Sequence, residues 1–435
     1  MSDETTGTFR RRTNPTVKVM RPAAPPVRHF TVQRVDQPGN AQMVSSGSAQ
    51  VGSHTLNEVV VEEPTVSRFH CEISVTPDGP MVRDLGSANG TEVDGVRVKE
   101  AFLKNGSMLR LGNATMRFQL ELDSTPEPVS KSDSFGPLWG ASPAMRACFA
   151  LLERAAETSR PVLLEGETGT GKTAAAEAIH DAGSRKDEPF LPVDCASLAP
   201  ADLEAMLVGK ENPRRLSAFE EAREGTIFLD EVAELPLELQ GRLVTVLEKG
   251  ELKRPGGLTV GVRARVIAST RADLRQLVNA NRFRSELYFR LAVMKVRMPA
   301  LRQHPEDIPE LVDQWLEETG ATEDEANPLR AQDFLARLQT AVWVGNVREL
   351  FNHLDRCRVM RAPLNPGEGP QVAQVRPSAR QTWAEAKRLS NEEFERGYVE
   401  ALLERHKGKV SEAARAAQMD RVYLYRLIKR YGLKT

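Results

Sequence analysis

A phosphate-binding loop is the feature that most constrains the fold of this chain. The segment PVLLEGETGTGKT, residues 161–173, passes from an apolar stretch into a glycine-rich turn and satisfies the pattern G-x-x-x-x-G-K-[ST]. In such a loop the glycines let main-chain N–H groups curl around phosphates, the lysine reaches the β- and γ-phosphates, and the hydroxyl binds Mg²⁺. A helix expected from about residue 173 to 180 directs its positive N-terminus at the same anion. The predicted ATP-binding residues are Gly166, Glu167, Thr168, Gly169, Thr170, Gly171, Lys172 and Thr173.

A pair of carboxylates follows a second apolar strand. The segment GTIFLDE ends on Asp230 and Glu231. In ATP sites of this type the aspartate helps to hold Mg²⁺. We therefore assign Mg²⁺ to Thr173 and Asp230, and we assign Glu231 to orienting and activating the attacking water. The predicted reaction is hydrolysis of ATP to ADP and phosphate.

The pattern around these motifs is that of an α/β domain with a helical lid. Helical stretches alternate with the apolar strands PVLLEG, TIFLDE, ARVIAST and MKVRM, which is the α/β signature. We expect the α/β core at residues 138–299 and an all-helical lid at 300–362. A Pro- and Gly-rich linker is expected at 363–390.

The N-terminal part has a different pattern. Short β-type runs such as FTVQRV, CEISV and TMRFQLEL are separated by Gly, Pro, Asn and Asp, which predicts an antiparallel β-sandwich at residues 29–122. Residues 1–28 are polar, Thr-rich and Pro-rich, and we expect a disordered arm there. Residues 123–137 are expected to form a linker.

The C-terminal part is basic and predicts a helix-turn-helix at residues 391–435. Residues 395–435 hold 10 Lys and Arg against 5 Asp and Glu, whereas the whole chain has a net charge of −1. An Ala-rich helix at about 411–417 is followed by Asp420, which N-caps a second helix that closes at Gly432. The start of such a second helix points at base edges in double-stranded DNA, and the rest suits phosphates. Base contacts are assigned to Arg421 and Tyr423, and phosphate contacts to Tyr425, Arg426, Lys429 and Arg430. Leu424, Leu427 and Ile428 are expected in the core.

Composition excludes several classes of protein. The four cysteines are far apart and form no C-x-x-C pair, which argues against a disulfide framework or a zinc site and fits a reducing cytoplasm. No apolar run approaches the roughly 18 residues that span a bilayer, and Arg10 to Arg12 precede no apolar segment of a secretion signal. We expect a cytoplasmic protein without a membrane partner.

Residues 138–360 resemble the AAA+ domain of bacterial enhancer-binding proteins, which remodel sigma-54 RNA polymerase. The resemblance is carried by GETGTGKT, FEEAREGTIFLDEVAELPLELQGRLVTVLEKGELKRPGG, FRSELYFRLAVMKVRMPALRQHPEDI and WVGNVREL. It implies that Arg284 and Arg290 reach a neighbouring subunit's ATP, as arginine fingers do, and that Arg348 senses nucleotide. It also implies a hexamer- or heptamer-type ring. The alternative for each arginine is a surface ion pair.

Residues 30–122 resemble a forkhead-associated (FHA) domain. VSRFHCEI, VRDLGSANGTEVDG and LKNGSMLRLGNATMRF carry this resemblance. It implies a phosphothreonine site in which Ser67 and Arg68 hold the phosphate and Asn89 holds the peptide, while His70 braces the loop. The partner would be a phosphothreonine protein or a Ser/Thr kinase. Where the family has Gly-Arg this chain has Gly52-Ser53, and a β-sandwich that only mediates protein contacts is the alternative.

The tail resembles the Fis-type domain of the same regulators, in which the preceding helix, about 391–406, pairs with its copy in a dimer. Three departures concern the motor. Asp194 replaces an Asn that normally contacts the catalytic Glu, and a second carboxylate there would raise a pKa unless a cation lies between them. Arg271 stands where Asn or His is usual.

The third departure lies between Gly209 and Phe219, where nine residues, KENPRRLSA, replace the longer sigma-54 contact loop with its Gly-Ala-Phe-Thr-Gly-Ala pattern. We therefore expect a DNA-binding transcription regulator of the enhancer-binding type that acts with an RNA polymerase holoenzyme whose sigma factor is left open. One alternative is an ATP-binding repressor or activator that is not a motor. The other is an FHA adaptor.

Overall fold

The computed structural model describes residues 26–37, 39–76, 78–126, 128–210 and 216–367, together with Val399, Leu403, Val410 and Ile428. The chain forms two compact units, Met1–Pro363 and Leu364–Thr435. Within the described ranges no helix is both long and apolar enough to cross a membrane.

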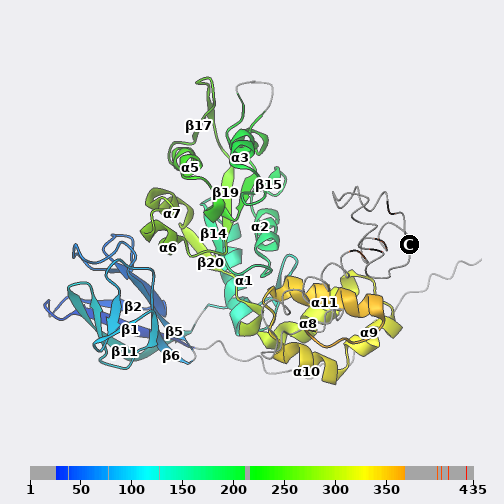
Figure 1. Cartoon of the computed structure of the whole chain (residues 1–435), viewed down its shortest axis with the longest axis horizontal. Coiled ribbons are helices and arrows are strands. Elements are labelled where there is room, and N and C mark those ends of the chain that lie inside the picture. Colours follow the sequence, from blue (N-terminus) through cyan, green and yellow to red (C-terminus); the bar gives the residue numbers. More distant parts are fainter. Residues whose placement is uncertain are drawn as a thin grey trace, which may run out of the picture. The chain divides into compact units, whose positions relative to one another are not determined.

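A β-sandwich forms the first part of the larger unit (Figure 1). One sheet has the strand order β2-β1-β11-β10-β7-β8 and the other β4-β3-β5-β6-β9. The strands of the first sheet are β1 (Pro26–Arg34), β2 (Ala41–Val44), β7 (Thr91–Val93), β8 (Val96–Val98), β10 (Met108–Leu111) and β11 (Ala114–Pro126). Those of the second are β3 (Ser48–Gly52), β4 (Val59–Val60), β5 (Cys71–Thr76), β6 (Gly79–Asp84) and β9 (Glu100–Phe102).

Alternation along these strands builds the core of the sandwich. Phe30 and Val32 on β1 are fully buried, whereas Thr31 between them is only partly buried, as expected when successive side chains point to opposite faces. Phe118 on β11 packs against Phe30 with ring centroids 5.5 Å apart. The strand begins at Pro26 and pairs with Pro126, so it starts inside the segment that we expected to be a disordered arm.

The expected linker at 123–137 is also partly ordered. β11 continues to Pro126, and β12 (Ser134–Phe135) pairs with β13 (Leu138–Trp139). Phe135 and Leu138 are buried in the core under α1 (Pro143–Ala156) and α2 (Lys172–Asp181). Burial of Phe135 explains why the chain is ordered before the α/β core begins.

A five-stranded parallel sheet forms the centre of the α/β core, with the order β15-β16-β19-β14-β20. Its strands are β14 (Val162–Glu165), β15 (Phe190–Asp194), β16 (Thr226–Asp230), β19 (Arg265–Thr270) and β20 (Met294–Arg297). The helices after α2 are α3 (Pro200–Leu207), α4 (Ala218–Glu221), η1 (Val232–Glu234), α5 (Leu237–Lys249), α6 (Leu274–Asn279) and α7 (Ser285–Leu291). A two-stranded ribbon of β17 (Glu251–Lys253) and β18 (Thr259–Gly261) follows α5.

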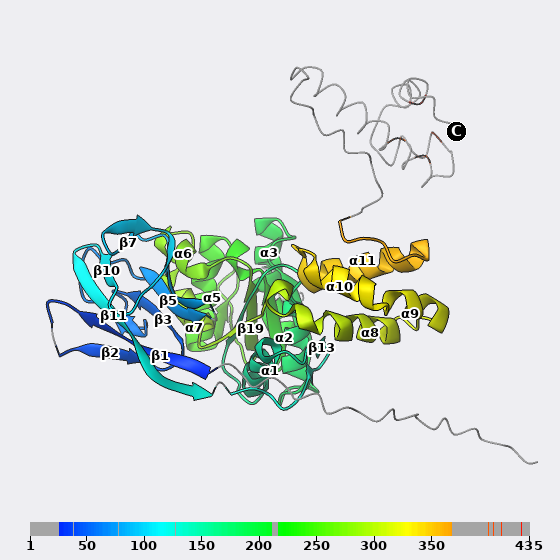
Figure 2. The ribbon, with the colours of Figure 1, turned by 90° about the horizontal axis from the view of Figure 1, so that it is seen from below.

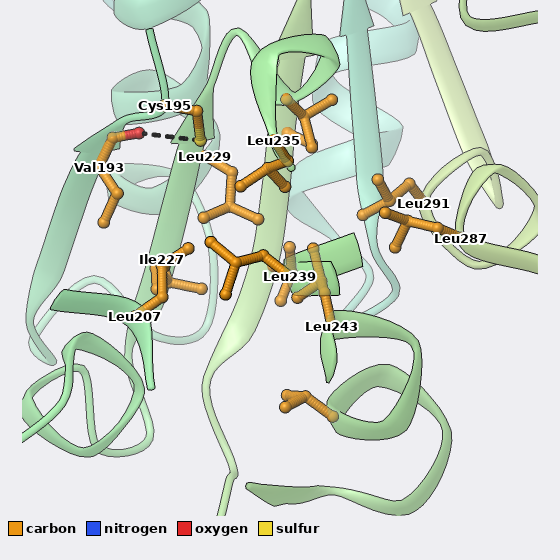
Figure 3. Close-up of a cluster of buried hydrophobic side chains, with 14 of the residues drawn as sticks. Val193, Cys195, Leu207, Ile227, Leu229, Leu235, Leu239, Leu243, Leu287 and Leu291 are labelled. Carbon is orange, nitrogen blue, oxygen red and sulfur yellow. Dashed lines mark hydrogen bonds between the residues drawn. The ribbon is translucent and has the colours of Figure 1, made fainter. Parts of the chain in front are cut away.

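Helices cover both faces of this sheet. Val162 and Leu164 on β14 point into the core under α1 and α2, and Leu163 between them belongs to the opposite core under α5 and α7. Figure 3 shows the second core, in which Ile227 and Leu229 of β16 lie beside Leu239 of α5. Both faces of the parallel sheet are therefore covered, which its near-continuous apolar strands require.

The lid is helical, as predicted. It contains η2 (Leu301–Gln303), η3 (Pro305–Asp307), α8 (Ile308–Glu318), α9 (Glu323–Leu329), α10 (Gln332–Thr340) and α11 (Asn346–Met360), and the last four lie side by side in Figure 2. Trp343 fixes the turn before α11, because it is buried and its indole N–H donates to Leu338 O at 2.9 Å. The structure confirms the predicted order along the chain of a β-sandwich, an α/β core and a helical lid.

Beyond residue 367 the smaller unit is described at four positions. Val399, Leu403, Val410 and Ile428 are helical and buried. The burial of Ile428 agrees with its predicted place in the core of the helix-turn-helix.

Candidate functional site

The phosphate-binding loop connects β14 to α2. Gly169 has φ +80° and Gly171 φ +90°, which is the left-handed region that favours glycine. A Cβ on Gly169 would lie 2.0 Å from Gly345 O in the lid, so the lid also requires glycine here. Lys172 is 7% exposed, and its Nζ donates to Gly166 O at 2.9 Å and to Glu167 O at 3.1 Å. The main-chain carbonyl groups of the loop therefore fix the position of the Lys172 ammonium group.

A cavity of about 610 Å³ lies along this loop. Its polar lining includes Lys172, Thr173, Asp230 and Glu231. Its apolar lining comes from the α/β core and the lid and includes Leu138, Trp139, Met145, Leu311, Val347 and Phe351. A cavity with both kinds of lining suits a molecule that carries phosphates and a flat base.

Ser269 at the end of β19 holds both members of the carboxylate pair. Its hydroxyl donates to Asp230 Oδ1 and accepts a hydrogen bond from Glu231 N at 3.1 Å. Glu231 has φ +55°, a left-handed conformation that is costly outside glycine and that persists where the surroundings fix it. The strained turn directs the Glu231 side chain into the cavity.

Two cations flank the Glu231 carboxylate. Lys172 Nζ lies 3.5 Å from Oε1, and Arg271 Nε lies 3.9 Å from Oε2. Asp194 lines the same cavity, but its Oδ1 accepts hydrogen bonds from Ala196 N at 2.9 Å and Ser197 N at 3.2 Å. The carboxylate of Asp194 is thus bound to its own turn, and Lys172 and Arg271 lie beside Glu231.

The lid reaches the phosphate-binding loop through two residues that begin α11. Asn346 is fully buried; its Nδ2 donates to Thr168 O at 3.0 Å and to Glu167 Oε2 at 3.2 Å. Arg348 N donates to Gly169 O at 3.4 Å, and Arg348 lines the cavity. The structure therefore brings Arg348 to the nucleotide cavity, where the resemblance places it.

A second link between lid and loop is ionic. Arg302 Nη1 donates to Glu167 Oε2 at 2.7 Å. Hydrogen bonds from Arg302 and then Asn346 lower the pKa of Glu167 to about 2. Glu167 is therefore ionised across the physiological range and ties the loop to the lid.

Arg284 and Arg290 lie elsewhere. Arg284 caps α7 and its Nε donates to Leu237 O at 3.0 Å, while Arg290 Nη2 lies 3.0 Å from Glu248 Oε1. Among the described residues, those lining this chain's own cavity include neither arginine. Arg290 thus forms the surface ion pair that was its alternative role.

The predicted phosphothreonine residues meet at one edge of the β-sandwich. Ser67 and Arg68 lie on the loop before β5, and Asn89 lies on the loop before β7. Ala88 N donates to Ser67 Oγ at 3.0 Å, and Asn89 Nδ2 donates to Thr65 O at 2.7 Å, so the two loops are joined.

Two buried residues hold this edge in shape. His70 is fully buried; Ser67 N donates to its Nδ1 at 3.1 Å, and its Nε2 lies 3.0 Å from Gly90 O. A Cβ on Gly52 would lie 2.2 Å from Arg68 O, so glycine is needed there, and Ser53 N donates to Ser67 O at 3.0 Å. His70 braces the loop as expected, and Ser53 stands beside it.

The predicted DNA-contacting residues fall outside the described part of the chain. These are Arg421, Tyr423, Tyr425, Arg426, Lys429 and Arg430. They remain predictions from the sequence.

Sequence reasoning missed three residues that hold the site together: Ser269, Arg302 and Asn346. Their partners lie 38, 135 and 179 residues away in the chain. No local pattern marks such pairs. Asn346 and Arg302 had a weak signal, because they lie inside the quoted segments WVGNVREL and FRSELYFRLAVMKVRMPALRQHPEDI.

Comparison with known proteins agrees with this geometry. The model of the sigma-54 interaction domain matches residues 138–297, and that of the FHA domain matches 49–112. The AAA+ ATPase lid domain matches 302–389, and the Fis family of bacterial regulatory proteins matches 390–431.

Two relatives show how far the similarity extends. The transcriptional regulator NtrC of Azospirillum brasilense is 38% identical over 241 residues, which is 53% of this chain and 50% of NtrC. The alignment thus spans about half the length of that relative. The anaerobic nitric oxide reductase transcription regulator NorR of Aeromonas hydrophila is 33% identical over 384 residues, or 80% of this chain and 75% of NorR.

Among solved structures, NtrX of Brucella abortus in complex with ATP is 34% identical, with a TM-score of 0.50. The match covers 69% of this chain and 71% of NtrX. The same protein in complex with ADP also has a TM-score of 0.50. Since the similarity to NorR covers three quarters of that relative, and since all four domain types match in order, the chain belongs to the family of sigma-54 enhancer-binding transcription regulators.

Proposed function

We propose that this chain is a DNA-bound transcription regulator that hydrolyses ATP in a ring and receives a phosphothreonine signal through its FHA domain. One observation carries the proposal. The phosphate-binding loop, the carboxylate pair and the lid arginine Arg348 all line a single cavity whose lining is partly polar and partly apolar.

The chemistry of that cavity fits Mg²⁺–ATP. NtrX of Brucella abortus has been solved with ATP and with ADP, which supports a nucleotide here. The Thr173 hydroxyl and the Asp230 carboxylate supply the hard oxygen ligands that Mg²⁺ prefers. The ion would offset negative charge on the phosphates, while Lys172 binds the β- and γ-phosphates and Glu231 orients the water.

Assembly into a ring would bring arginines of a neighbouring subunit to each ATP site. Arg284 and Arg290 contact Leu237 and Glu248 of α5 and are not among the described residues that line this chain's own cavity. In a hexamer- or heptamer-type ring they would reach the next subunit's ATP and stabilise charge on the transferring phosphoryl group. We therefore propose both as catalytic residues acting in trans.

The two flanking domains would bind the phosphothreonine ligand and the DNA. Ser67, Arg68 and Asn89 form a polar edge suited to a phosphothreonine, which offers about two negative charges and three acceptor oxygens. The ligand would be a phosphothreonine protein or a Ser/Thr kinase. The Fis-type tail, as a dimer, would bind double-stranded DNA through the predicted residues of its second helix and so bring the ring to an RNA polymerase holoenzyme.

Steady-state ATPase activity measured against protein concentration tests the proposal. Turnover per subunit should rise steeply with concentration, because a site completed in trans works only after assembly. Lys172→Ala should abolish ATP binding, and Glu231→Gln should bind ATP without turning it over. Arg290→Ala should bind ATP as wild type does and lose turnover. Wild-type turnover in Glu231→Gln, or turnover per subunit independent of concentration, would contradict the assigned roles.

A further inference from the structure

The loop that carries Ser67 and Arg68 packs against the ATPase core. Phe69, the residue after Arg68, is fully buried, as is Leu85 on the neighbouring loop. Both belong to the hydrophobic core that also contains Leu274 of α6 and Leu287 of α7. The phosphate-binding edge of the FHA domain is therefore joined to the helix pair α6–α7.

Hydrogen bonds fix this contact close to the proposed phosphate ligands. Arg68 Nη1 donates to Ser285 Oγ on α7 at 3.2 Å. Asn279 at the end of α6 donates through Nδ2 to Phe69 O at 2.6 Å and to Leu85 O at 2.9 Å. One amide of the ATPase core thus holds both loops of the phosphopeptide edge.

Aromatic rings extend the contact to the loop after β3. His54 stacks on Phe289 of α7, with centroids 4.0 Å apart and an interplanar angle of 26°. Phe69 meets Tyr288 edge-on at 5.2 Å. Burial, and then the charge of Arg68, lower the pKa of His54, which favours the neutral ring that stacks on Phe289.

Ion pairs close the other side of the contact. Glu72 of β5 lies 3.1 Å from Arg275, and Arg83 of β6 lies 3.2 Å from Asp273. The side chains of Arg275 and Asp273 are 7% and 14% exposed. Well-shielded pairs of opposite charge specify one orientation of two surfaces better than exposed pairs do.

Helix α7 has a second surface that matters for the proposed motor. Arg284 caps the helix and Arg290 lies in its last turn, and both face α5. Ser285, Tyr288 and Phe289 of the same helix face the FHA domain. The eight residues from Arg284 to Leu291 therefore make the FHA contact and also carry the two proposed trans arginines.

We propose that α6–α7 is a built-in binding surface for the phosphate-binding edge of the FHA domain, and that a phosphothreonine ligand binds this edge in competition with it. The inference rests on the proposed phosphothreonine site. A phosphate that binds Arg68 competes with Ser285 for the Arg68 guanidinium. A peptide that lies across the loop after β3 and the loop before β5 competes for the surface that is covered by the contact of His54 with Phe289. Release of α7 then frees the helix for the subunit interface.

The test uses the full chain and degenerate nonapeptides with a central phosphothreonine or threonine. Asn279→Ala and Phe289→Ala weaken the contact from the ATPase side without touching Ser67, Arg68 or Asn89. Gln276→Ala, at an exposed position of α6, is the matched control. Asn279→Ala removes two hydrogen bonds and Phe289→Ala removes the ring stack with His54. Each weakening variant should therefore bind the phosphorylated peptides at least about fivefold more tightly than wild type, and the control should not.

A second readout is the protein concentration at which ATPase activity appears. The phosphorylated peptides should lower this concentration for the wild-type protein. For the weakening variants the concentration should already be lower in the absence of peptide. Equal phosphopeptide affinity in wild type and both variants would overturn the competition and leave the phosphothreonine site standing. Failure of every protein to distinguish the two peptide forms would overturn the phosphothreonine site as well. If neither the peptides nor the substitutions change the protein concentration at which ATPase activity appears, the proposed link between the FHA contact and ring assembly is wrong.

Discussion

The main-chain N–H of Arg271 donates to Oε2 of Glu231 at 3.1 Å, and the Arg271 guanidinium lies 3.9 Å from the same oxygen. On the other side Lys172 Nζ lies 3.5 Å from Oε1. Each oxygen of the proposed water-activating carboxylate thus faces a cation or a donor. Arg271 stands where an Asn or His is usual in the family, and the arginine supplies the extra charge.

Arg271→Asn should therefore raise the ATPase turnover number. The substitution keeps the main-chain hydrogen bond but removes the guanidinium, so Glu231 can turn more readily toward a water. The Arg271 side chain is 56% exposed, and exposed ion pairs contribute about 0.2–1 kcal/mol, which corresponds to an increase of up to about fivefold. Steady-state kinetics should show a higher kcat with an unchanged KM. Arg271→Lys is the control, and a fall in kcat for Arg271→Asn would show that the guanidinium assists catalysis.

Arg302→Gln should loosen the lid in a pH-dependent way. Arg302 holds the pKa of Glu167 at about 2, below its ordinary value of 4.5. A carboxylate with a lowered folded-state pKa stabilises the fold above the ordinary pKa, and this stabilisation is lost as pH falls toward 2. The deficit of the variant should be at most about 1 kcal/mol because the pair is half exposed. Urea unfolding should show a constant deficit from pH 5 to 7 that shrinks below pH 4.5. A deficit that grows at low pH would contradict this assignment.

Ser53→Arg should strengthen phosphothreonine binding. Ser53 occupies the position of a main phosphate ligand in the FHA family, and its amide already bonds the loop that carries Ser67. A charge-assisted hydrogen bond contributes about 1.5–3 kcal/mol, so affinity for a phosphothreonine peptide should rise about tenfold or more in calorimetry. Arg68→Ala should remove most of the preference for the phosphorylated form. Equal binding of both forms by wild type and Ser53→Arg would reduce the domain to a scaffold.

Arg421→Ala and Lys429→Ala should weaken DNA binding in different ways. Loss of a base contact relaxes preference by about 1–3 kcal/mol at one position, whereas loss of a phosphate contact weakens all sequences alike and reduces the salt dependence. Binding of each variant to a randomised set of duplexes at two salt concentrations separates the two effects. A uniform loss for Arg421→Ala would reverse the assignment of base and phosphate contacts.

The protein alone should give little open complex on a sigma-54 promoter. Nine residues join Gly209 to Phe219, and the family's Gly-Ala-Phe-Thr-Gly-Ala pattern is not among them. Arg254 contacts both flanks of this segment: it donates to Lys210 O at 2.9 Å and pairs with Glu220 at 3.1 Å. Reconstituted transcription with sigma-54 holoenzyme and with the housekeeping enzyme tests this. Robust ATP-dependent transcripts from the sigma-54 promoter would show that another loop makes the contact.

The ATPase core was predictable because its signals are local. The strand, loop and helix from Val162 to Asp181 follow from an apolar run, three glycines and a lysine that lie within twenty residues. The ordered start of β1 at Pro26 was missed, because a proline-rich run joins the sheet only through its partner strand β11, where Pro26 pairs with Pro126, 100 residues later. The contact of Phe69 and Leu85 with α6–α7 was missed for the same reason. The sequence around a fully buried Phe in a loop does not indicate which surface of the protein buries it.

Asn346 gives the lid a particular mechanical character. Its side chain is fully buried, with its oxygen accepting from Leu301 N at 2.8 Å and its nitrogen donating to Thr168 O and Glu167 Oε2. Its backbone is left-handed, with φ +53°. A rotation of the lid away from the loop would take the buried amide nitrogen of Asn346 from its two partners on the loop, and an unsatisfied buried donor costs about 1–3 kcal/mol. The lid therefore resists displacement from the loop, and a movement of the loop is transmitted to α11 through this side chain.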